Sequence, residues 1–144
     1  MPSQTDKTKL DLSVVHEFLT HSYWAEGISL DVVKRSIAHS LCFGIYCNGS
    51  QVGFARVISD FATFAYLADV FILPHERGKG LSKWLMKVII EHPALQGLRR
   101  FTLATKDAHH LYAQFGFTAF DKPDRWMQLH NPSVYKKENP VHRG

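Results

Sequence analysis

The chain of 144 residues is long enough for one domain with a substantial buried core. Its content of 45% hydrophobic residues excludes an intrinsically disordered protein. The net charge is +4, but the chain lacks the dense cluster of basic residues that is typical of a nucleic-acid-binding protein. No apolar run approaches the roughly 18 residues of a membrane span, and the polar first residues have no signal-peptide core. We therefore expect a cytoplasmic protein that contacts neither nucleic acid nor membrane.

The first third of the chain predicts two short helices. Residues 1–9 are expected to be flexible. Apolar spacing predicts one helix from a cap at Ser13 to about His21, and a second from Ser29 or Asp31 to Ser40. The loop between them carries two large aromatic residues, Tyr23 and Trp24.

Three strands are expected to follow. Leu41–Cys47 and Gln51–Ser59 flank Asn48-Gly49, which is a strong signal for a hairpin turn. After a turn at residues 60–63, the nearly continuous apolar run Phe64–Leu73 is typical of a buried strand, and Pro74 ends it because proline cannot donate to a sheet.

A glycine loop and a helix come next. Arg77-Gly78-Lys79-Gly80 predicts a tight turn, and apolar residues from Leu81 recur at helical spacing until Pro93. The first amides of a helix have no internal partners, and glycines let a phosphate approach them closely. The spacing fits neither a Walker loop nor a dinucleotide fingerprint, and a plain turn between strand and helix is the alternative to a pyrophosphate site.

The last part of the chain predicts a strand, a helix and a hairpin. The strand covers Arg99–Ala104, and the helix covers Asp107–Phe115 with Gly116 as its C-terminal cap. An antiparallel pair, 117–120 with 126–130, should follow, and residues 132–144 should be extended or flexible. This order of elements predicts a single α+β domain over residues 1–144, with one mixed sheet.

Two segments resemble the GNAT family of N-acetyltransferases. Arg77–Ser82 resembles the Arg/Gln-x-x-Gly-x-Gly/Ala signature, with Ser82 in place of the final Gly or Ala. Thr105–Phe117 resembles the Asn-x-x-Ala-x-x-Leu-Tyr-x-x-x-Gly-Phe segment, with Thr105 in place of the Asn. The element order also matches over roughly residues 10–130. The resemblance implies the acyl-coenzyme A N-acyltransferase fold, in which helices flank a central, mostly antiparallel mixed sheet, and it implies acetyl-coenzyme A as cosubstrate.

The resemblance also implies which residues contact the cofactor. The Arg77–Ser82 loop would hold the pyrophosphate, and the strand backbone at residues 70–72 would pair with the pantetheine amides. The residues implied are Val70, Phe71, Ile72, Arg77, Gly78, Lys79, Gly80, Leu81, Ser82, Thr105, Ala108 and Tyr112.

Two residues are candidates for the chemistry. Tyr112 matches the family tyrosine beside the cofactor sulfur, and a phenol with a pKa of about 10 can protonate a departing thiolate; the alternative is a core residue. Asp69 is a carboxylate in an apolar strand, which is costly unless it is partnered. It would bind or deprotonate the substrate amine, or it would be held by a backbone amide or by Arg56.

The family geometry would build the acceptor site from Tyr23, Trp24, Glu26, Phe61 and Trp126, unless these side chains are simply packed. The nine histidines lack the i,i+4 spacing of a zinc helix, so we expect no metal. The sequence therefore predicts transfer of an acetyl group to a primary amine of a small molecule by direct attack. Acetylation of protein lysines or N-termini, and a non-catalytic acyl-coenzyme A sensor, are the alternatives. A homodimer is left open.

Overall fold

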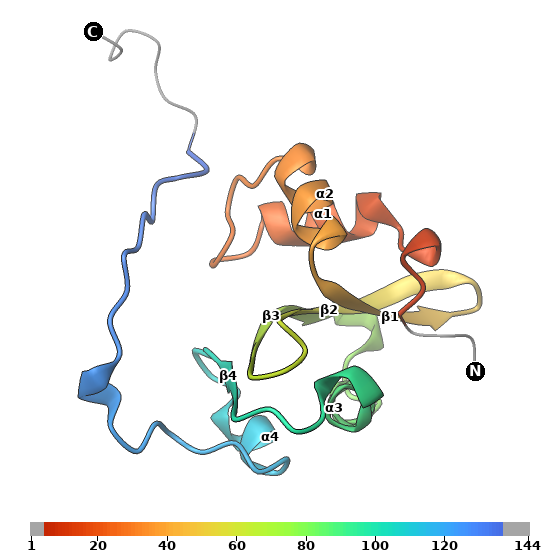
Figure 1. The fold of residues 1–144 in the computed structure, drawn as a ribbon. Helices are drawn as coiled ribbons and strands as arrows, with labels where there is room; N and C mark the ends of the chain where they lie inside the picture. Colours follow the sequence, from red (N-terminus) through yellow and green to blue (C-terminus); the bar gives the residue numbers. More distant parts are fainter. Residues whose placement is uncertain (1–4, 137–144) are drawn as a thin grey trace, which may run out of the picture.

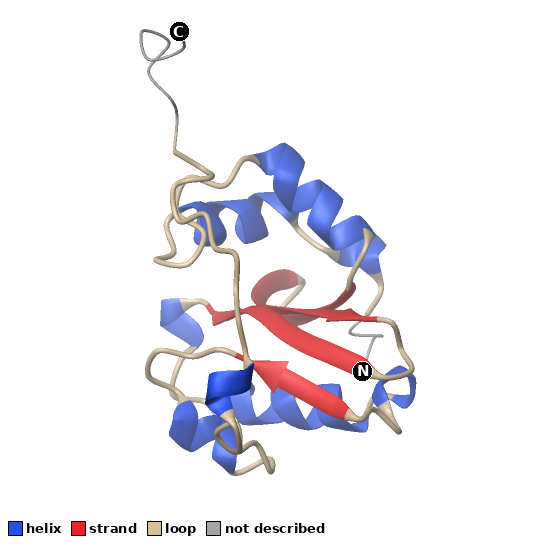
Figure 2. Cartoon of the chain, turned by 60° about the vertical axis from the view of Figure 1, so that its left-hand side comes forward, coloured by secondary structure: helices blue, strands red, loops and turns tan. Residues whose placement is uncertain are grey.

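A computed structural model describes residues 5–136, in which helices cover both faces of one mixed sheet (Figures 1 and 2). Helices α1 and α2 lie on one face, and α3 and α4 lie on the other side (Figure 1). This arrangement confirms the expected α+β class. The elements are α1 (Leu12–Thr20), α2 (Leu30–Ala38), β1 (Leu41–Cys47), β2 (Ser50–Ser59), β3 (Phe64–Ile72), α3 (Leu81–Glu91), β4 (Arg100–Leu103) and α4 (His109–Ala113), with 3-10 turns at Lys7–Lys9, Pro74–Glu76, Pro93–Leu95 and Pro123–Arg125.

The sheet has the order β1-β2-β3-β4, in which only the β3–β4 pair is parallel. The β1–β2 hairpin turns at Asn48 and Gly49, whose φ angles of 52° and 82° are both positive. Two positive φ angles are what a type I′ turn requires. The hairpin predicted from this dipeptide is confirmed.

Each face of the sheet buries its own hydrophobic cluster. Leu85, Met86 and Ile89 of α3 pack against one face. Val15 and Leu19 of α1, together with residues of α2, pack against the other. The helical spacing of these apolar residues explains both contacts, because one stripe of each helix is apolar.

Two expectations for the N-terminal part are wrong. Helix α1 is capped by Asp11, whose side chain accepts from the amides of Ser13 and Val14, and not by Ser13 itself. Residues 7–9, expected to be flexible, form a 3-10 turn, and the Lys7 ammonium donates to the Ala38 carbonyl at 3.3 Å. The second helix begins as predicted, since the Ser29 hydroxyl accepts from the Val32 amide.

The predicted C-terminal hairpin is also wrong. Neither residues 117–120 nor residues 126–130 belong to a strand, and α4 is shorter than expected. Gly116 does end the turn after α4 with a φ of 93°. Beyond Pro123–Arg125, residues 126–136, here called the C-terminal arm, run from the α4 side toward α1 and α2 (Figure 1). Among residues 5–136, no helix is both long and apolar enough to cross a bilayer.

Asp60 organises the turn into β3, and it should make stability depend on acid. Its exposed carboxylate accepts from the amides of Ala62, Thr63 and Phe64 and from the Thr63 hydroxyl. These hydrogen bonds lower the pKa of Asp60, and the bond from the Thr63 amide has the largest effect. A folded-state pKa below the unfolded value gives stability that is present above about pH 4 and is lost as the pH falls below it.

Asp60→Ala should therefore lower the melting temperature at pH 7 and leave less stability to lose between about pH 4 and pH 2. Thermal unfolding followed by circular dichroism across this range measures both effects. Asp124→Ala, which removes another exposed carboxylate, is the matched control. If Asp60→Ala lost as much stability at acid pH as the wild type does, Asp60 would not be the source of this pH dependence.

Candidate active site

Strand β3 contains a bulge at Asp69. Phe54 of β2 pairs with Phe71 and Arg56 pairs with Ala68, so β3 carries one extra residue between these pairs. Asp69 has a φ of 55°, in the left-handed region that aspartate tolerates better than most residues. The extra residue reverses which side chains face α3, because successive strand residues alternate between faces.

The bulge lies where β3 and β4 separate. The two strands pair only from Phe64↔Arg100 to Leu67↔Leu103, and β3 then continues alone to Ile72. The backbone of residues 68–72 on that side is thus free of a β4 partner. A gap between diverging parallel strands can admit an extended ligand that pairs with the free edge.

A cavity of about 620 Å³ opens at this divergence, and it is called the central cavity below. Aromatic side chains from four parts of the chain contribute to its wall. The lining residues are Tyr23, Trp24, Ala25, Ile28, Val32, Ser36, Arg56, Tyr66, Leu67, Ala68, Asp69, Val70, Leu103, Ala104, Thr105, Lys106, Asp107, Ala108, Tyr112 and Tyr135.

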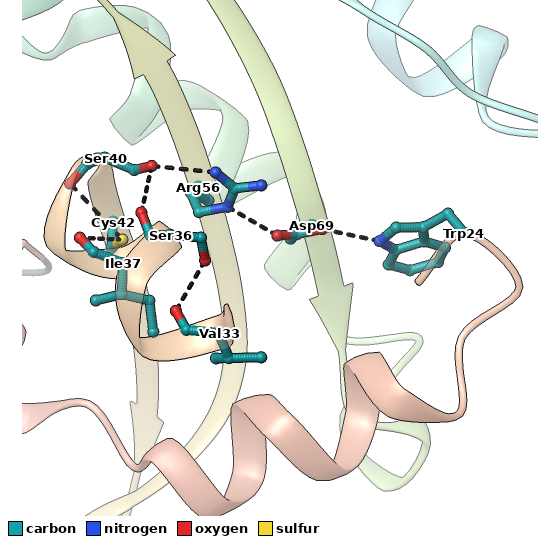
Figure 3. A network of polar contacts seen from close by, with 8 residues as sticks. All are labelled: Trp24, Val33, Ser36, Ile37, Ser40, Cys42, Arg56 and Asp69. Atoms are coloured by element: carbon teal, nitrogen blue, oxygen red, sulfur yellow. Dashed lines mark hydrogen bonds and ion pairs between the residues drawn. The ribbon is translucent and has the colours of Figure 1, made fainter. Parts of the chain in front are cut away.

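Both carboxylate oxygens of Asp69 accept hydrogen bonds from protein side chains (Figure 3). One carboxylate oxygen accepts from Arg56 Nε at 2.8 Å, and the other accepts from the indole of Trp24 at 2.9 Å. The ion pair is mostly buried, with 16% of the Arg56 side chain and 10% of the Asp69 side chain exposed. Arg56 also donates to the Ser40 hydroxyl at 3.1 Å. The sequence left Asp69 either to act on the substrate amine or to be held by a backbone amide or by Arg56, and the structure pairs it with Arg56.

Tyr112 lies on α4 at the wall of the central cavity, and only 8% of it is exposed. Its ring meets Phe117 edge-on, with 6.0 Å between centroids. Burial, and to a smaller extent Tyr23 and Asp107, raises the pKa of the Tyr112 phenol. The hydroxyl therefore stays protonated across the neutral range and can act as a donor.

Thr105 and Ala108 shape the turn before α4. The Thr105 hydroxyl accepts from the Ala108 amide at 3.0 Å. Both residues line the central cavity beside Tyr112. The Thr105 oxygen thus caps the turn, and its hydroxyl hydrogen remains available to a ligand.

The glycine loop leaves the N-terminus of α3 open. Gly80 is the N-terminal cap of α3, and no side chain caps the helix. Gly78 and Gly80 have φ angles of 83° and 76°, and a Cβ atom on either would meet nothing within 4 Å. The loop of Gly78 and Gly80 before α3 is called the cradle below. It combines the free amides at the start of α3, open space and the positive end of the helix dipole, all of which suit a phosphate.

The cations around the cradle are partly tied to the protein. Arg77 Nε donates to the Ile72 carbonyl at 3.0 Å, so its guanidinium lies back against the end of β3. The Lys79 ammonium is 2.7 Å from the Glu76 carboxylate. Leu81 and Ser82 form the half-buried first turn of α3.

The candidate acceptor residues divide into two groups. Tyr23 and Trp24 line the central cavity, whereas Glu26, Phe61 and Trp126 do not. Trp126 instead stacks on Phe120, and Glu26 is an exposed residue of the loop before α2. Tyr66, Lys106 and Tyr135 also line the central cavity and were not among the candidates. Tyr66 could have been found from its position on the apolar β3, but nothing in the tail sequence marks Tyr135.

The cysteines and histidines of residues 5–136 form no metal site, and Cys42 is not an activated nucleophile. Within residues 5–136, no three His, Cys, Asp or Glu side chains lie close enough to hold a metal ion. Burial raises the pKa of the Cys42 thiol to about 11, so it is not a thiolate at neutral pH. Cys42 therefore belongs to the core.

The absence of a catalytic metal stays a prediction, and it can be tested directly. We expect purified protein to contain far less than one zinc per chain, and its transferase activity to survive dialysis against a chelator. Elemental analysis and a thiol-release assay measure the two quantities. Stoichiometric zinc together with activity lost to the chelator would contradict it.

Comparison with known proteins agrees with this geometry. The sequence model of the Acetyltransferase (GNAT) family matches residues 12–117, which include both helices of the first third, the whole sheet and the glycine loop. The chain therefore belongs to the GNAT acetyltransferase family and is an acetyl-coenzyme A-dependent N-acetyltransferase. The family resemblance found in the two sequence motifs is confirmed.

Individual relatives support the same assignment. A crystal structure of a candidate GNAT acetyltransferase from Xanthomonas campestris pv. campestris is 54% identical, with a TM-score of 0.90, over 92% of this chain and 94% of that one. A candidate acetyltransferase of Gibberella zeae, FG08082, is 34% identical, covering 76% of this chain and 74% of its own. A candidate acetyltransferase from Clostridium acetobutylicum, solved with acetyl-coenzyme A, shares the fold at 15% identity and a TM-score of 0.63, over 84% of this chain and 92% of that one.

Proposed function

We propose that this protein acetylates the primary amine of a small molecule, and that the amine attacks acetyl-coenzyme A directly. The observation that carries the proposal is the central cavity, where the free edge of β3 and the Tyr112 side chain meet. The pyrophosphate would lie in the cradle of Gly78 and Gly80, and the pantetheine arm would run between the diverging strands to Tyr112.

Two steps of the reaction can be assigned to groups of this chain. The neutral amine attacks the thioester carbonyl carbon, the carbon–sulfur bond breaks, and the departing thiolate takes a proton from Tyr112; the proton that the nitrogen loses passes to solvent, from which the Tyr112 phenol is restored. Tyr112 is the donor of that proton, since its raised pKa keeps the phenol protonated. A free backbone amide of β3 near Val70 is suited to stabilise the carbonyl oxygen as it gains negative charge. The buried, protonated Cys42 argues against an acyl-enzyme.

The size and lining of the central cavity favour a small acceptor over a protein. Its volume of about 620 Å³ is within the usual range for small-molecule sites, roughly 300–1,000 Å³. Tyr23, Trp24, Tyr66 and Tyr135 give it aromatic walls, which suit a compact apolar or planar group next to the amine. A protein lysine acceptor would favour a long open groove.

Asp69 serves to position the site in this proposal. Both of its oxygens accept hydrogen bonds from protein groups, so it is poorly placed to take a proton from the amine. Its bond to the Trp24 indole ties the loop between α1 and α2 to the β3 bulge. Glu26 does not line the central cavity, so it is not placed to hold a cationic amine together with Asp69.

A panel of primary amines and of lysine and N-terminal peptides, with thiol release as the readout, tests the proposal. Turnover with small amines well above that with peptides is the expected result. Preferential turnover of peptides would replace it with protein acetylation, and coenzyme A binding without any turnover would point to an acyl-coenzyme A sensor. The cytoplasmic location expected from the sequence stays a prediction.

A further inference from the structure

We propose that the acceptor amine also carries an anionic group, a carboxylate or a phosphate, and that Lys106 recognises this group at the wall of the central cavity. The inference rests on the proposed transfer to a small amine, and it names the class of that amine. Three observations carry it: the charges that line the central cavity, the contact that holds the Lys106 side chain, and the place of Lys106 in the same cavity as Tyr112.

Four charged side chains line the central cavity, two of each sign: Arg56, Asp69, Lys106 and Asp107. The Arg56–Asp69 pair, at 2.8 Å and mostly buried, cancels its own charge. Lys106 differs, because within residues 5–136 no carboxylate lies at ion-pair distance from its ammonium. The cavity wall therefore presents a cation that no acidic side chain of the described chain neutralises.

An aromatic contact holds the Lys106 ammonium at this wall. Its Nζ atom lies over the Tyr23 ring, 5.2 Å from the centroid. That ring meets the Trp24 indole edge-on, with 5.1 Å between centroids, and the indole donates to Asp69 at 2.9 Å. A cation–π contact orients an ammonium without occupying its hydrogen-bond donors through an acceptor oxygen. The side chain is thus placed, and its donors remain available to an anion.

The neighbouring carboxylate gives the acceptor a direction in the cavity. Asp107 lines the same cavity as Tyr112, and its negative charge contributes to the raised pKa of the Tyr112 phenol. The Asp107 charge therefore acts at the end of the cavity where the thiolate leaves, and it attracts the amine end of an incoming acceptor. Lys106 attracts the anionic end. Opposite charges in one cavity are complementary to a small zwitterion.

The charge pattern also separates small acceptors from proteins. The amine of a protein lysine has no anionic group a few bonds away, so Lys106 would add nothing to its binding. In the free protein the Lys106 side chain is exposed, and water screens its charge. An acceptor that fills the cavity displaces this water, so the attraction between the two charges becomes stronger in the complex.

Matched pairs of amines, with and without the anionic group, test the inference. One pair is phenylalanine and phenethylamine, and the other is phosphoethanolamine and ethanolamine. Thiol release gives kcat/KM for each amine, and the ratio within a pair measures the preference for the anion. We expect the wild type to prefer the anionic member of at least one pair, and that pair identifies the anion.

Variants of Lys106 assign this preference to its charge. Lys106→Gln should lower the ratio by about 10-fold, the usual order for a hydrogen bond to a charged group. Lys106→Glu should reverse the preference, and Lys106→Arg should keep most of it. Lys122→Gln removes an exposed cation that does not line the central cavity, and it should keep the wild-type ratio. Calorimetric titration of the anionic amine into coenzyme A-loaded protein measures the same difference without turnover.

Several outcomes would overturn the inference. Ratios that are equal in the wild type and in Lys106→Gln would do so while small amines remain good substrates, and the proposed function would then stand. A rise in the KM for acetyl-coenzyme A that affects both members of a pair equally would assign Lys106 to the cofactor instead. Turnover of peptides alone would overturn the proposed function, and this inference with it.

Discussion

Replacing Tyr112 with phenylalanine should lower kcat by about 10²–10⁴-fold, the usual range for general acid assistance. The change removes one hydroxyl and keeps the buried ring and its contact with Phe117. Packing, coenzyme A affinity and the KM for acetyl-coenzyme A should change little, because the proton is transferred only as the thiolate leaves. Steady-state kinetics with the best amine of the panel measures the loss.

Tyr66→Phe is the matched control, since it removes a hydroxyl that lines the same central cavity from β3 and not from α4. It should affect the acceptor KM more than kcat.

The raised pKa of Tyr112 also predicts how kcat depends on pH. The phenol stays protonated above its ordinary range, so kcat should not fall through the loss of this proton below about pH 10. Full turnover in a folded Tyr112→Phe protein would make Tyr112 a packing residue.

The elements that the sequence predicts well are those with strong local signals. The Asn48-Gly49 turn, the apolar run of β3 and the spacing of Leu85 and Ile89 each act within a few residues. The glycine loop and the segment around Tyr112 belong to this group too, because each is a short motif that requires particular residue types at fixed positions. These local signals were enough to identify the fold and the family.

The bulge at Asp69 has no comparable signal. One extra residue in β3 is set by the register against β2, which depends on pairing across the sheet and not on neighbouring residues. The pairing with Arg56 was foreseeable only as one alternative beside a backbone amide partner and a role toward the substrate amine. The Trp24 bond was not foreseeable, because the loop that carries this residue is 45 residues away along the chain.

The C-terminal arm shows why a strand pattern can mislead. Alternation in residues 126–130 predicts an extended segment, and it says nothing of which edge the segment pairs with. The predicted hairpin assumed that the partner was the nearest segment. Anchors at Trp126 and Tyr135, which come from tertiary packing, hold the arm elsewhere.

Gly80→Asp should weaken coenzyme A binding by roughly 10–100-fold, equivalent to about 1.4–2.8 kcal/mol. Gly80 caps α3, and a Cβ there meets nothing within 4 Å, so the new carboxylate would occupy the space in which we expect the pyrophosphate. It would also bring a negative charge to the helix terminus that the phosphates need. Isothermal titration calorimetry with coenzyme A measures the change.

Two further variants separate charge from backbone strain in this experiment. Gly80→Asn has nearly the same shape without the charge, and it should lose much less affinity than Gly80→Asp. Gly97→Asp puts the same side chain at a φ of 74°, against 76° at Gly80, also in open space but outside the cradle, and its affinity should match the wild type. If Gly80→Asp, Gly80→Asn and Gly97→Asp all bound coenzyme A as tightly as the wild type, the pyrophosphate would not lie at the α3 terminus. Equal losses in Gly80→Asn and Gly80→Asp would mean that the backbone conformation of the loop, and not electrostatic attraction at the helix end, controls binding.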